Sequence, residues 1–155
     1  MRFLRVMVVA SAAIVVLSPL LAAQEQEKKI KRSDLPPAVE KTVVEQSQGA
    51  VVRGFSQENG QTFYEAELMV NGHSKDVLMD VDGAVVEVEE QIPTESLTPT
   101  VRDGLQAKAG KGKIVKVEKL SKKGRLVAYE AQILTNEKRS EVQVGPDGKP
   151  LGHEE

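Results

Sequence analysis

Apolar and polar residues alternate in several short stretches of the chain. Between residues 62 and 70, Tyr64, Ala66, Leu68 and Val70 occupy every second position, which is the period of a β-strand with one buried face. The same period predicts further strands at residues 51–56, 76–81, 84–89, 113–120, 125–135 and 138–144. Asn71-Gly72 and Asp82-Gly83 are typical two-residue hairpin turns, and Asn59-Gly60 is a third turn signal. The strands are therefore expected to be antiparallel.

Two segments instead carry apolar residues at the spacing of an α-helix. In the first, Val39, Val43 and Val44 share a face; in the second, Val101 and Leu105 do. Caps and stops frame both segments: Ser33 or Asp34, Pro37 and Gly49 in the first, and Thr98, Pro99 and Gly110 in the second. Helices of about three turns are unstable alone, so each must pack on the strands.

The order of these signals occurs twice. Leu, Pro and Val in residues 34–39 recur in residues 96–101, while Tyr64-Glu65-Ala66 recurs as Tyr129-Glu130-Ala131. Such conserved order indicates a tandem duplication. We therefore predict an α+β fold of two tandem units, each a short N-terminal helix packed on a four-stranded antiparallel β-sheet. The units span residues 34–91 and 92–155, and the last strand of the second is expected to be short or missing.

Residues 1–23 have the pattern of a cleaved export signal. Arg2 and Arg5 precede an apolar run that Ser18 and Pro19 end. The run is short for a membrane-spanning helix, so no stable membrane anchor is expected after cleavage, and the protein is predicted to be periplasmic or secreted. Residues 24–33 are polar and basic, which favours a disordered, soluble leader.

These motifs together resemble the PepSY-like domain: a helix opened by Leu-Pro-x-x-Val, a strand with Tyr-Glu-Ala, an Asn-Gly hairpin and a strand ending in Asp-Gly. A tandem pair of such units is similar in plan to the β-lactamase-inhibitor-protein-like family. The resemblance implies an exported, non-catalytic module that binds or restrains peptidases or other cell-envelope proteins. Inhibitors of that family carry many aromatic residues and disulfides, whereas this chain lacks both Trp and Cys, so none of their binding residues is transferred.

Composition narrows the function further. The 155 residues include no Cys and only 3% aromatic residues, and the net charge is −2. Disulfide frameworks and Cys-ligated zinc are thereby excluded, and nucleic-acid binding is not expected because it needs a clustered basic excess.

Charge is distributed unevenly between the two halves. Residues 34–92 hold twelve acidic and three basic residues, whereas residues 93–155 hold nine acidic and twelve basic ones. The polar strand faces of the first half form a candidate site for a basic protein partner: Phe63, Glu65, Glu67, Met69, Asp76, Asp80, Glu87 and Glu89. Two other interpretations remain: the charges keep an exposed sheet face soluble, or the unlike halves attract each other within one chain or between chains.

No catalytic, cofactor-binding or metal-binding residue is assigned. Asp80, Asp82, Gly83 and Glu89 fall at calcium-loop positions counted from Leu78, but a Leu opens the loop and the flanks alternate as strands, so a hairpin explains them better; weak divalent-cation binding stays open. His73 and His153 lie in no zinc motif.

The sequence therefore predicts a non-catalytic exported binding module. Its expected role is to inhibit or modulate a cell-envelope or secreted enzyme, of the peptidase or β-lactamase class. The alternatives are a periplasmic sensor of a small ligand or cation, and a self-assembling envelope protein in which edge strands pair between chains, for example as a homodimer.

Overall fold

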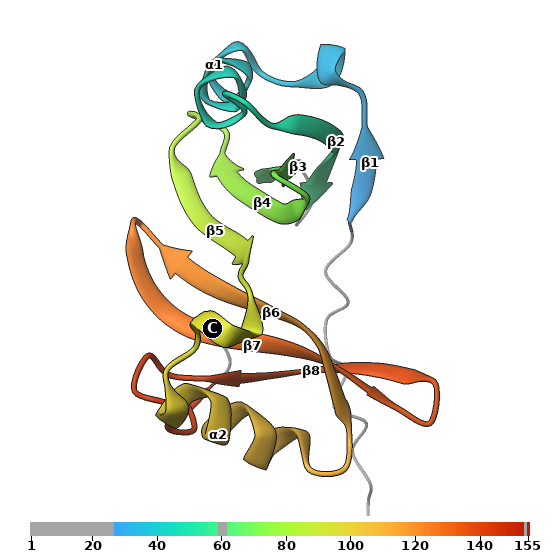
Figure 1. Cartoon of the computed structure of the whole chain (residues 1–155). Helices are drawn as coiled ribbons and strands as arrows, with labels where there is room; N and C mark the ends of the chain where they lie inside the picture. The colour runs from blue at the N-terminus through green and yellow to red at the C-terminus, as the bar shows by residue number, and fades with distance from the viewer. Residues whose placement is uncertain (1–26, 59–61, 154) are drawn as a thin grey trace, which may run out of the picture.

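The computed structural model describes residues 27–58, 62–153 and 155 (Figure 1). The expected export signal and the Asn59-Gly60 turn lie outside these residues. In chain order the strands and α-helices are β1 (Lys28–Ile30), α1 (Pro37–Gln46), β2 (Val51–Glu58), β3 (Phe63–Val70), β4 (His73–Asp80), β5 (Val85–Gln91), α2 (Pro99–Ala109), β6 (Lys113–Lys122), β7 (Arg125–Thr135) and β8 (Lys138–Val144). A short 3-10 helix precedes each α-helix, at Arg32–Asp34 and Thr94–Ser96.

All the strands belong to one eight-stranded antiparallel sheet, in the order β1 to β8. The predicted fold of two separate units, each with its own four-stranded sheet, is therefore wrong. The two halves merge because β5 pairs with β6, from Glu87 opposite Lys122 to Gln91 opposite Glu118. A strand edge presents unpaired N–H and C=O groups. Here those groups of β5, the last strand of the first half, form hydrogen bonds with those of β6, the first strand of the second half. The duplication itself stays a prediction.

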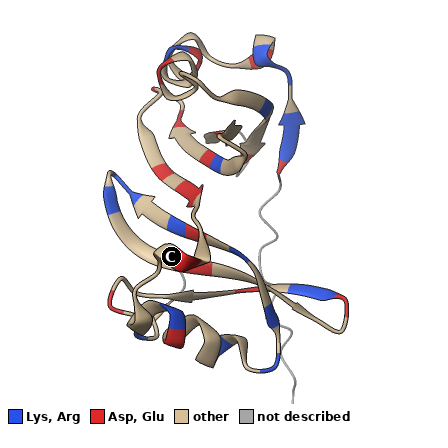
Figure 2. Cartoon of the chain, in the orientation of Figure 1, with Lys and Arg blue, Asp and Glu red and all other residues tan. Residues whose placement is uncertain are grey.

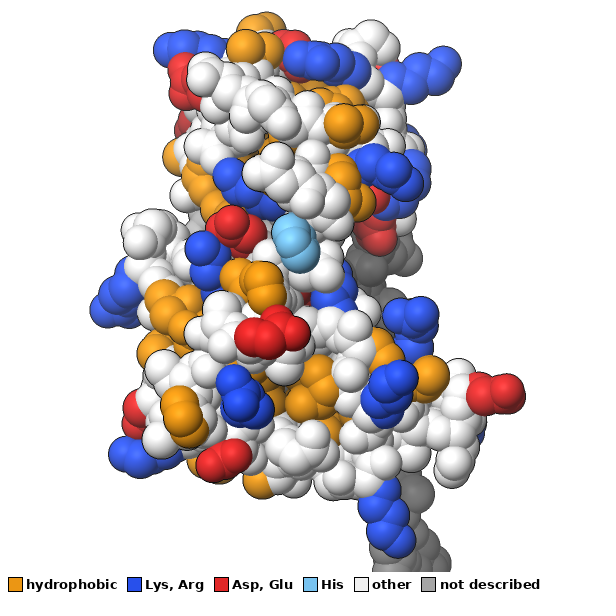
Figure 3. Space-filling view, viewed as in Figure 1, with side chains coloured by type: hydrophobic (Ala, Val, Ile, Leu, Met, Phe, Trp, Pro, Cys, Tyr) orange, Lys and Arg blue, Asp and Glu red, His pale blue; other side chains and the backbone are white. Residues whose placement is uncertain are grey.

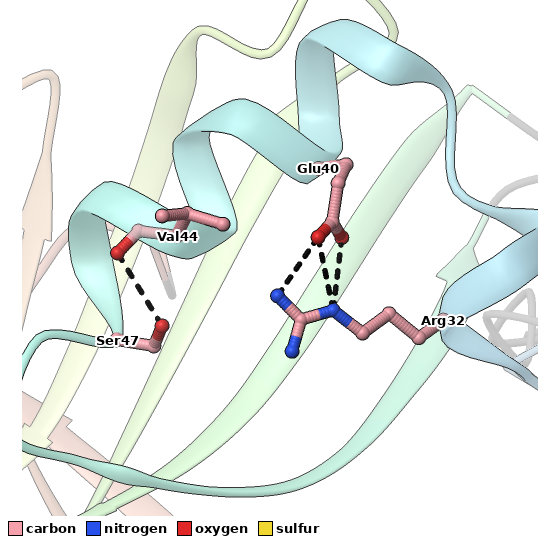
Figure 4. Close-up of polar contacts among 4 residues, drawn as sticks. All are labelled: Arg32, Glu40, Val44 and Ser47. Carbon is pink, nitrogen blue, oxygen red and sulfur yellow. Dashed lines mark hydrogen bonds and ion pairs between the residues drawn. The ribbon is translucent and has the colours of Figure 1, made fainter.

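The described part of the segment predicted to be a disordered leader contains regular structure. Lys28–Ile30 forms β1, which extends the sheet by pairing with Phe55–Gln57 of β2. The 3-10 helix that follows is attached to α1 by Arg32, whose guanidinium donates to the Glu40 carboxylate at 2.8 and 2.9 Å (Figure 4). The backbone hydrogen bonds between β1 and β2 and the ion pair between Arg32 and Glu40 hold this segment in place, although its polar sequence had suggested that it would be solvated and disordered.

Both helices form where their apolar spacing and prolines place them. Thr98 caps α2 by accepting a hydrogen bond from the Val101 N–H, as predicted, but α1 starts after Pro36 instead of a Ser33 or Asp34 cap. Val44 was expected on the buried face of α1, yet it is 51% exposed. In the last turn of α1 the Ser47 hydroxyl donates to the Val44 carbonyl (Figure 4). Neither described helix is long and apolar enough to cross a bilayer.

The hairpin turns follow the sequence signals, and one further turn was not predicted. Asn71-Gly72 has positive φ at both residues, and Asp82-Gly83 closes the β4–β5 hairpin. Asn136-Glu137 also turns with positive φ, at 49° and 65°, although it contains no glycine. A bulge between Leu78 and Met79 shifts the register of β5, so that Val85 and Val88 both pack on the core although strict alternation would place them on opposite faces.

The core consists of two apolar clusters on one face of the sheet. The first packs α1 on β2–β4, and the second packs α2 on β6–β8. The register of β5 and β6 places both clusters on the same face of the sheet. Val88 packs on the first cluster and lies directly opposite Ser121, so the two side chains point to the same face. Ser121 and buried Val117 are four residues apart in β6 and therefore also share a face. Since the helices nonetheless lie at opposite ends of the molecule (Figure 1), the sheet is bent, with the helices outside and its uncovered face inside the bend.

Gly83 lets the β4–β5 turn approach α1. Its φ is +78°, a side chain there would meet the Ala38 carbonyl oxygen at 2.5 Å, and the Thr42 hydroxyl donates to the Gly83 carbonyl at 2.7 Å. We predict that Gly83→Ala lowers the free energy of unfolding by roughly 2–4 kcal/mol, from left-handed strain plus displacement of α1. Urea denaturation measures the loss.

Gly72→Ala is the matched control. Gly72 also has positive φ (+85°), but a side chain there would meet nothing within 4 Å, so only the conformational cost of about 1 kcal/mol is expected. Equal losses for the two variants would show that the turn does not press against α1.

Candidate functional site

The uncovered face of the sheet holds a small acidic pocket. Its volume is about 150 Å³, and its lining comes from β2, β3, β4 and β5: Glu58, Glu65, Asp76, Leu78, Glu87 and Glu89. Alternation along each strand turns these side chains away from the core, because their neighbours Tyr64, Val77 and Val88 pack beneath α1. Five carboxyl groups thus surround one cavity.

Burial perturbs these carboxyl groups. It raises the pKa of Glu89 to about 8, with added repulsion from Glu130, Glu118, Glu87 and Asp76. The pKa of Asp76 rises to about 6, again through burial and then through repulsion from Glu118. The pKa of Glu65 is raised by burial and by a hydrogen bond with Glu58. A half-buried carboxyl loses hydration as its neighbours add negative potential, and both effects favour the neutral acid.

A second acidic group continues from the pocket toward β6. Carboxylate oxygens of Asp76, Glu89 and Glu118 lie within 4.8 Å of one another. Glu118 is only 2% exposed; it pairs with the Lys116 ammonium at 2.7 Å and accepts a hydrogen bond from the Ser74 hydroxyl at 3.2 Å. Among the described residues, these three carboxylates are the set with the spacing to hold a metal ion.

The group extends to β7 through Glu130. The Gln143 amide donates to its carboxylate at 2.9 Å, and burial raises its pKa. Leu120 and Ala128 lie on this same face but are 1% and 0% exposed, so the bend closes over the face near β6 and β7.

The structure brings together half of the predicted partner-binding residues. Glu65, Asp76, Glu87 and Glu89 line the pocket. The other four lie on the same face but outside its lining, and they are Phe63, Glu67, Met69 and Asp80.

Two of those four have local partners. Glu67 pairs with Lys29, whose pKa is raised by its contacts with Glu27 and Glu67. Asp80 accepts backbone hydrogen bonds from Asp82 and Ala84 at 3.0 and 2.9 Å. The hairpin interpretation of Asp82-Gly83 is thereby confirmed, and the carboxyls grouped with Glu89 are Asp76 and Glu118 instead of the calcium-loop residues.

Glu58, Glu118 and Glu130 were missed as site residues. A signal for Glu130 was available, because the repeated Tyr-Glu-Ala motif places Glu65 and Glu130 at matching positions, and both have a raised pKa on the uncovered face. No such signal marked Glu118, which reaches the site only because β5 and β6 pair.

The basic residues of β6 lie beside the acidic residues of β5. Lys119 pairs with Glu90 at 2.9 Å, and Lys122 lies 3.6 Å from Glu87. Lys122 also pairs with Glu155, whose backbone N–H donates to the Gln143 side chain. Figure 2 shows the two signs meeting between the halves, so the unlike halves attract each other within one chain. Elsewhere, Figure 3 shows apolar side chains in small groups separated by polar and charged ones.

The chain matches no protein-family model and no curated protein. Its fold is similar to that of three solved structures from Bacteroides. A DUF2874 family protein from Bacteroides ovatus has 20% identity and a TM-score of 0.62, over 76% of this chain and 84% of that one. A candidate periplasmic protein from Bacteroides eggerthii has 16% identity and a TM-score of 0.64, over 76% and 86%. A BLIP-like protein from Bacteroides fragilis has 15% identity and a TM-score of 0.56, over 74% and 81%.

At these identities the likeness establishes the fold alone. It confirms that the chain has a fold like that of a BLIP-like protein, and it does not extend to a PepSY-like domain.

The Lys116–Glu118 pair provides a stability test of the site. Lys116→Met leaves the Glu118 carboxylate buried without its ammonium partner. Because the Lys116 side chain is 23% exposed, we predict a loss of roughly 1–3 kcal/mol in the free energy of unfolding, below the range for a fully buried pair. Chemical denaturation at pH 7 measures it.

Lys119→Met is the control for this prediction. Lys119 and its partner Glu90 are each 41% exposed, so its loss should stay below about 1 kcal/mol. If the two variants lose equal stability, the buried Glu118 carboxylate is not stabilised by the Lys116 ammonium.

Proposed function

We propose that this protein is a non-catalytic binding module of the periplasm or cell exterior, and that the uncovered face of its sheet docks a basic segment of a protein partner. The observation that carries the proposal is the acidic pocket, where five carboxyl groups from four strands surround one cavity. The resemblance of the fold to a BLIP-like protein and to a candidate periplasmic protein supports the class and the location.

Charge supplies the chemical reason. Carboxyl groups held together in a hollow focus negative potential, which speeds the encounter with a cationic surface. An incoming Lys or Arg would offset the repulsion that now raises the pKa of Glu65 and Glu89. The pocket volume of about 150 Å³ suits the end of a single basic side chain better than a folded domain, so the rest of the contact must come from the surrounding face.

The surrounding face offers a modest apolar contribution. Phe63 and Met69 lie at opposite ends of β3, on the same face as the pocket. Binding energy in protein interfaces is concentrated in a few large side chains, and the 3% aromatic content leaves Phe63 as the best such anchor. We infer an association that relies on charge, with inhibition or modulation of an exported peptidase or β-lactamase-class enzyme as its role.

Affinity capture tests this proposal. The purified protein is immobilised and exposed to envelope extract from its own source, and the retained protein is identified and titrated. The double variant Glu65→Gln/Glu87→Gln removes two groups that can become negatively charged against a cationic partner, at constant size. We expect it to bind the retained partner roughly 10- to 30-fold more weakly, because each of the two lost contacts is worth on the order of 1 kcal/mol. The wild-type affinity should also fall as salt rises from about 50 to about 300 mM.

The control is Glu45→Gln/Glu95→Gln, which removes two exposed acidic groups away from the face. Its affinity should equal that of the wild type. Unchanged binding by Glu65→Gln/Glu87→Gln, or wild-type affinity that does not respond to salt, contradicts docking on the acidic face. If the partner is an enzyme, its activity with and without the protein then tests inhibition directly.

A further inference from the structure

Carboxyl groups outnumber ammonium groups on the uncovered face. Every strand from β2 to β8 contributes acid, and the terminal segments add two more: Glu27, Glu58, Glu65, Glu67, Asp76, Asp80, Glu87, Glu89, Glu118, Glu130, Glu141 and Glu155. Among the described residues, register places six basic ones on this face: Lys29, Lys113, Lys116, Lys122, Arg125 and Arg139. Three of them, Lys29, Lys116 and Lys122, make ion pairs with these acids.

The ion pairs of Lys29, Lys116 and Lys122 are made with acids other than Asp76 and Glu89. Lys29 contacts Glu27 and Glu67. Lys116 pairs with Glu118, and Lys122 with Glu87 and Glu155. The centre of the group, where Asp76 lies opposite Glu89, therefore holds more negative charge than the lysines neutralise.

The position of that centre matters for the whole molecule. Asp76 is on β4 and Glu89 on β5, and Glu118 of β6 has its carboxylate within 4.8 Å of both. These strands span the junction where the α1 half joins the α2 half, and the junction rests on five residue pairs between β5 and β6. Repulsion between these carboxylates acts directly across it.

A proton is the simplest countercharge for this arrangement. Burial penalises a charged carboxyl, and a group that cannot find a cation becomes neutral by binding a proton. Once neutral, it donates a short, strong hydrogen bond to a neighbouring carboxylate. Glu118 already has Lys116 and Ser74 as partners, which leaves Asp76 and Glu89 as the proton-binding pair.

We propose that the carboxyl cluster around Asp76 and Glu89 is a proton-operated element: in mildly acidic medium it holds protons that join β4, β5 and β6, and as the pH rises it loses them, which weakens the junction between the two halves. The proposal concerns the free protein and does not depend on the partner proposed above. The junction between the two halves is therefore expected to be most stable in mildly acidic surroundings.

The direction of the pH effect follows from linkage. The folded-state pKa values of Asp76 and Glu89, about 6 and about 8, lie above the ordinary values of 3.8 and 4.5. The folded state therefore binds more protons than the unfolded state between about pH 4 and pH 9. The stability contributed by these groups is fully present below pH 4 and is lost as the pH rises through 6 and 8.

Thermal unfolding of the purified protein against pH is the test, in buffers containing EDTA so that no divalent cation replaces the proton. We expect the melting temperature to fall by roughly 5 °C or more between pH 5.5 and pH 8.5. Glu89→Gln, which mimics the protonated acid, should melt above the wild type at pH 8.5 and lose much of the slope. Glu45→Gln, on the exposed side of α1, should keep the slope of the wild type.

A wild-type melting temperature that is constant or rises over this range overturns the proposal, as does a Glu89→Gln variant with the full slope. Should Glu89→Gln fail to fold, the carboxyl carbon NMR signals of wild-type Asp76 and Glu89 decide instead. Midpoints well above the ordinary values support the proposal, and midpoints near 4 for both residues overturn it.

Discussion

The fold depends on the backbone pairing between β5 and β6. Only five residue pairs make this junction, yet they place α1 and α2 on the same face of one sheet and leave the other face without a helix. Without the pairing each half would end in an open edge, which attracts other chains. Ion pairs of Lys119 with Glu90 and of Lys122 with Glu87 reinforce it, so the opposite charges of the two halves serve their own association.

The same junction creates the electrostatic character of the site. Bending the sheet brings acidic side chains of the first half next to Glu118 and Glu130 of the second and partly removes all of them from water. Negative charge has little effect on stability on an open, hydrated sheet, but it lowers the stability of the folded state when it is partly buried in this hollow. The cost is met in three ways: by lysine partners at the edges, by bound protons at the centre, and, in the proposed function, by a basic segment of a partner.

Much of the local structure was predictable from residue patterns. Alternation and turn residues located the strands and the Asn71-Gly72 and Asp82-Gly83 hairpins, because a period of two and a positive φ are properties of a few neighbouring residues. The errors arose where packing competes with pattern. Val44 matches the apolar spacing of α1 but its side chain is exposed, and a bulge puts both Val85 and Val88 on the core side of β5. Of the site, the sequence located Glu65, Asp76, Glu87 and Glu89 on one face, and it missed Glu118.

By itself, the sequence determined the two helices, the alternation that separates a core face from a polar face, and the excess of acid in residues 34–92. These follow from side-chain period, from capping and turn chemistry, and from composition. Only the tertiary structure decided that the strands form one sheet instead of two, that residues 28–30 add a strand, and that carboxyls of the two halves meet. Edge pairing uses backbone N–H and C=O groups that every strand carries, so no side-chain pattern specifies which edges join.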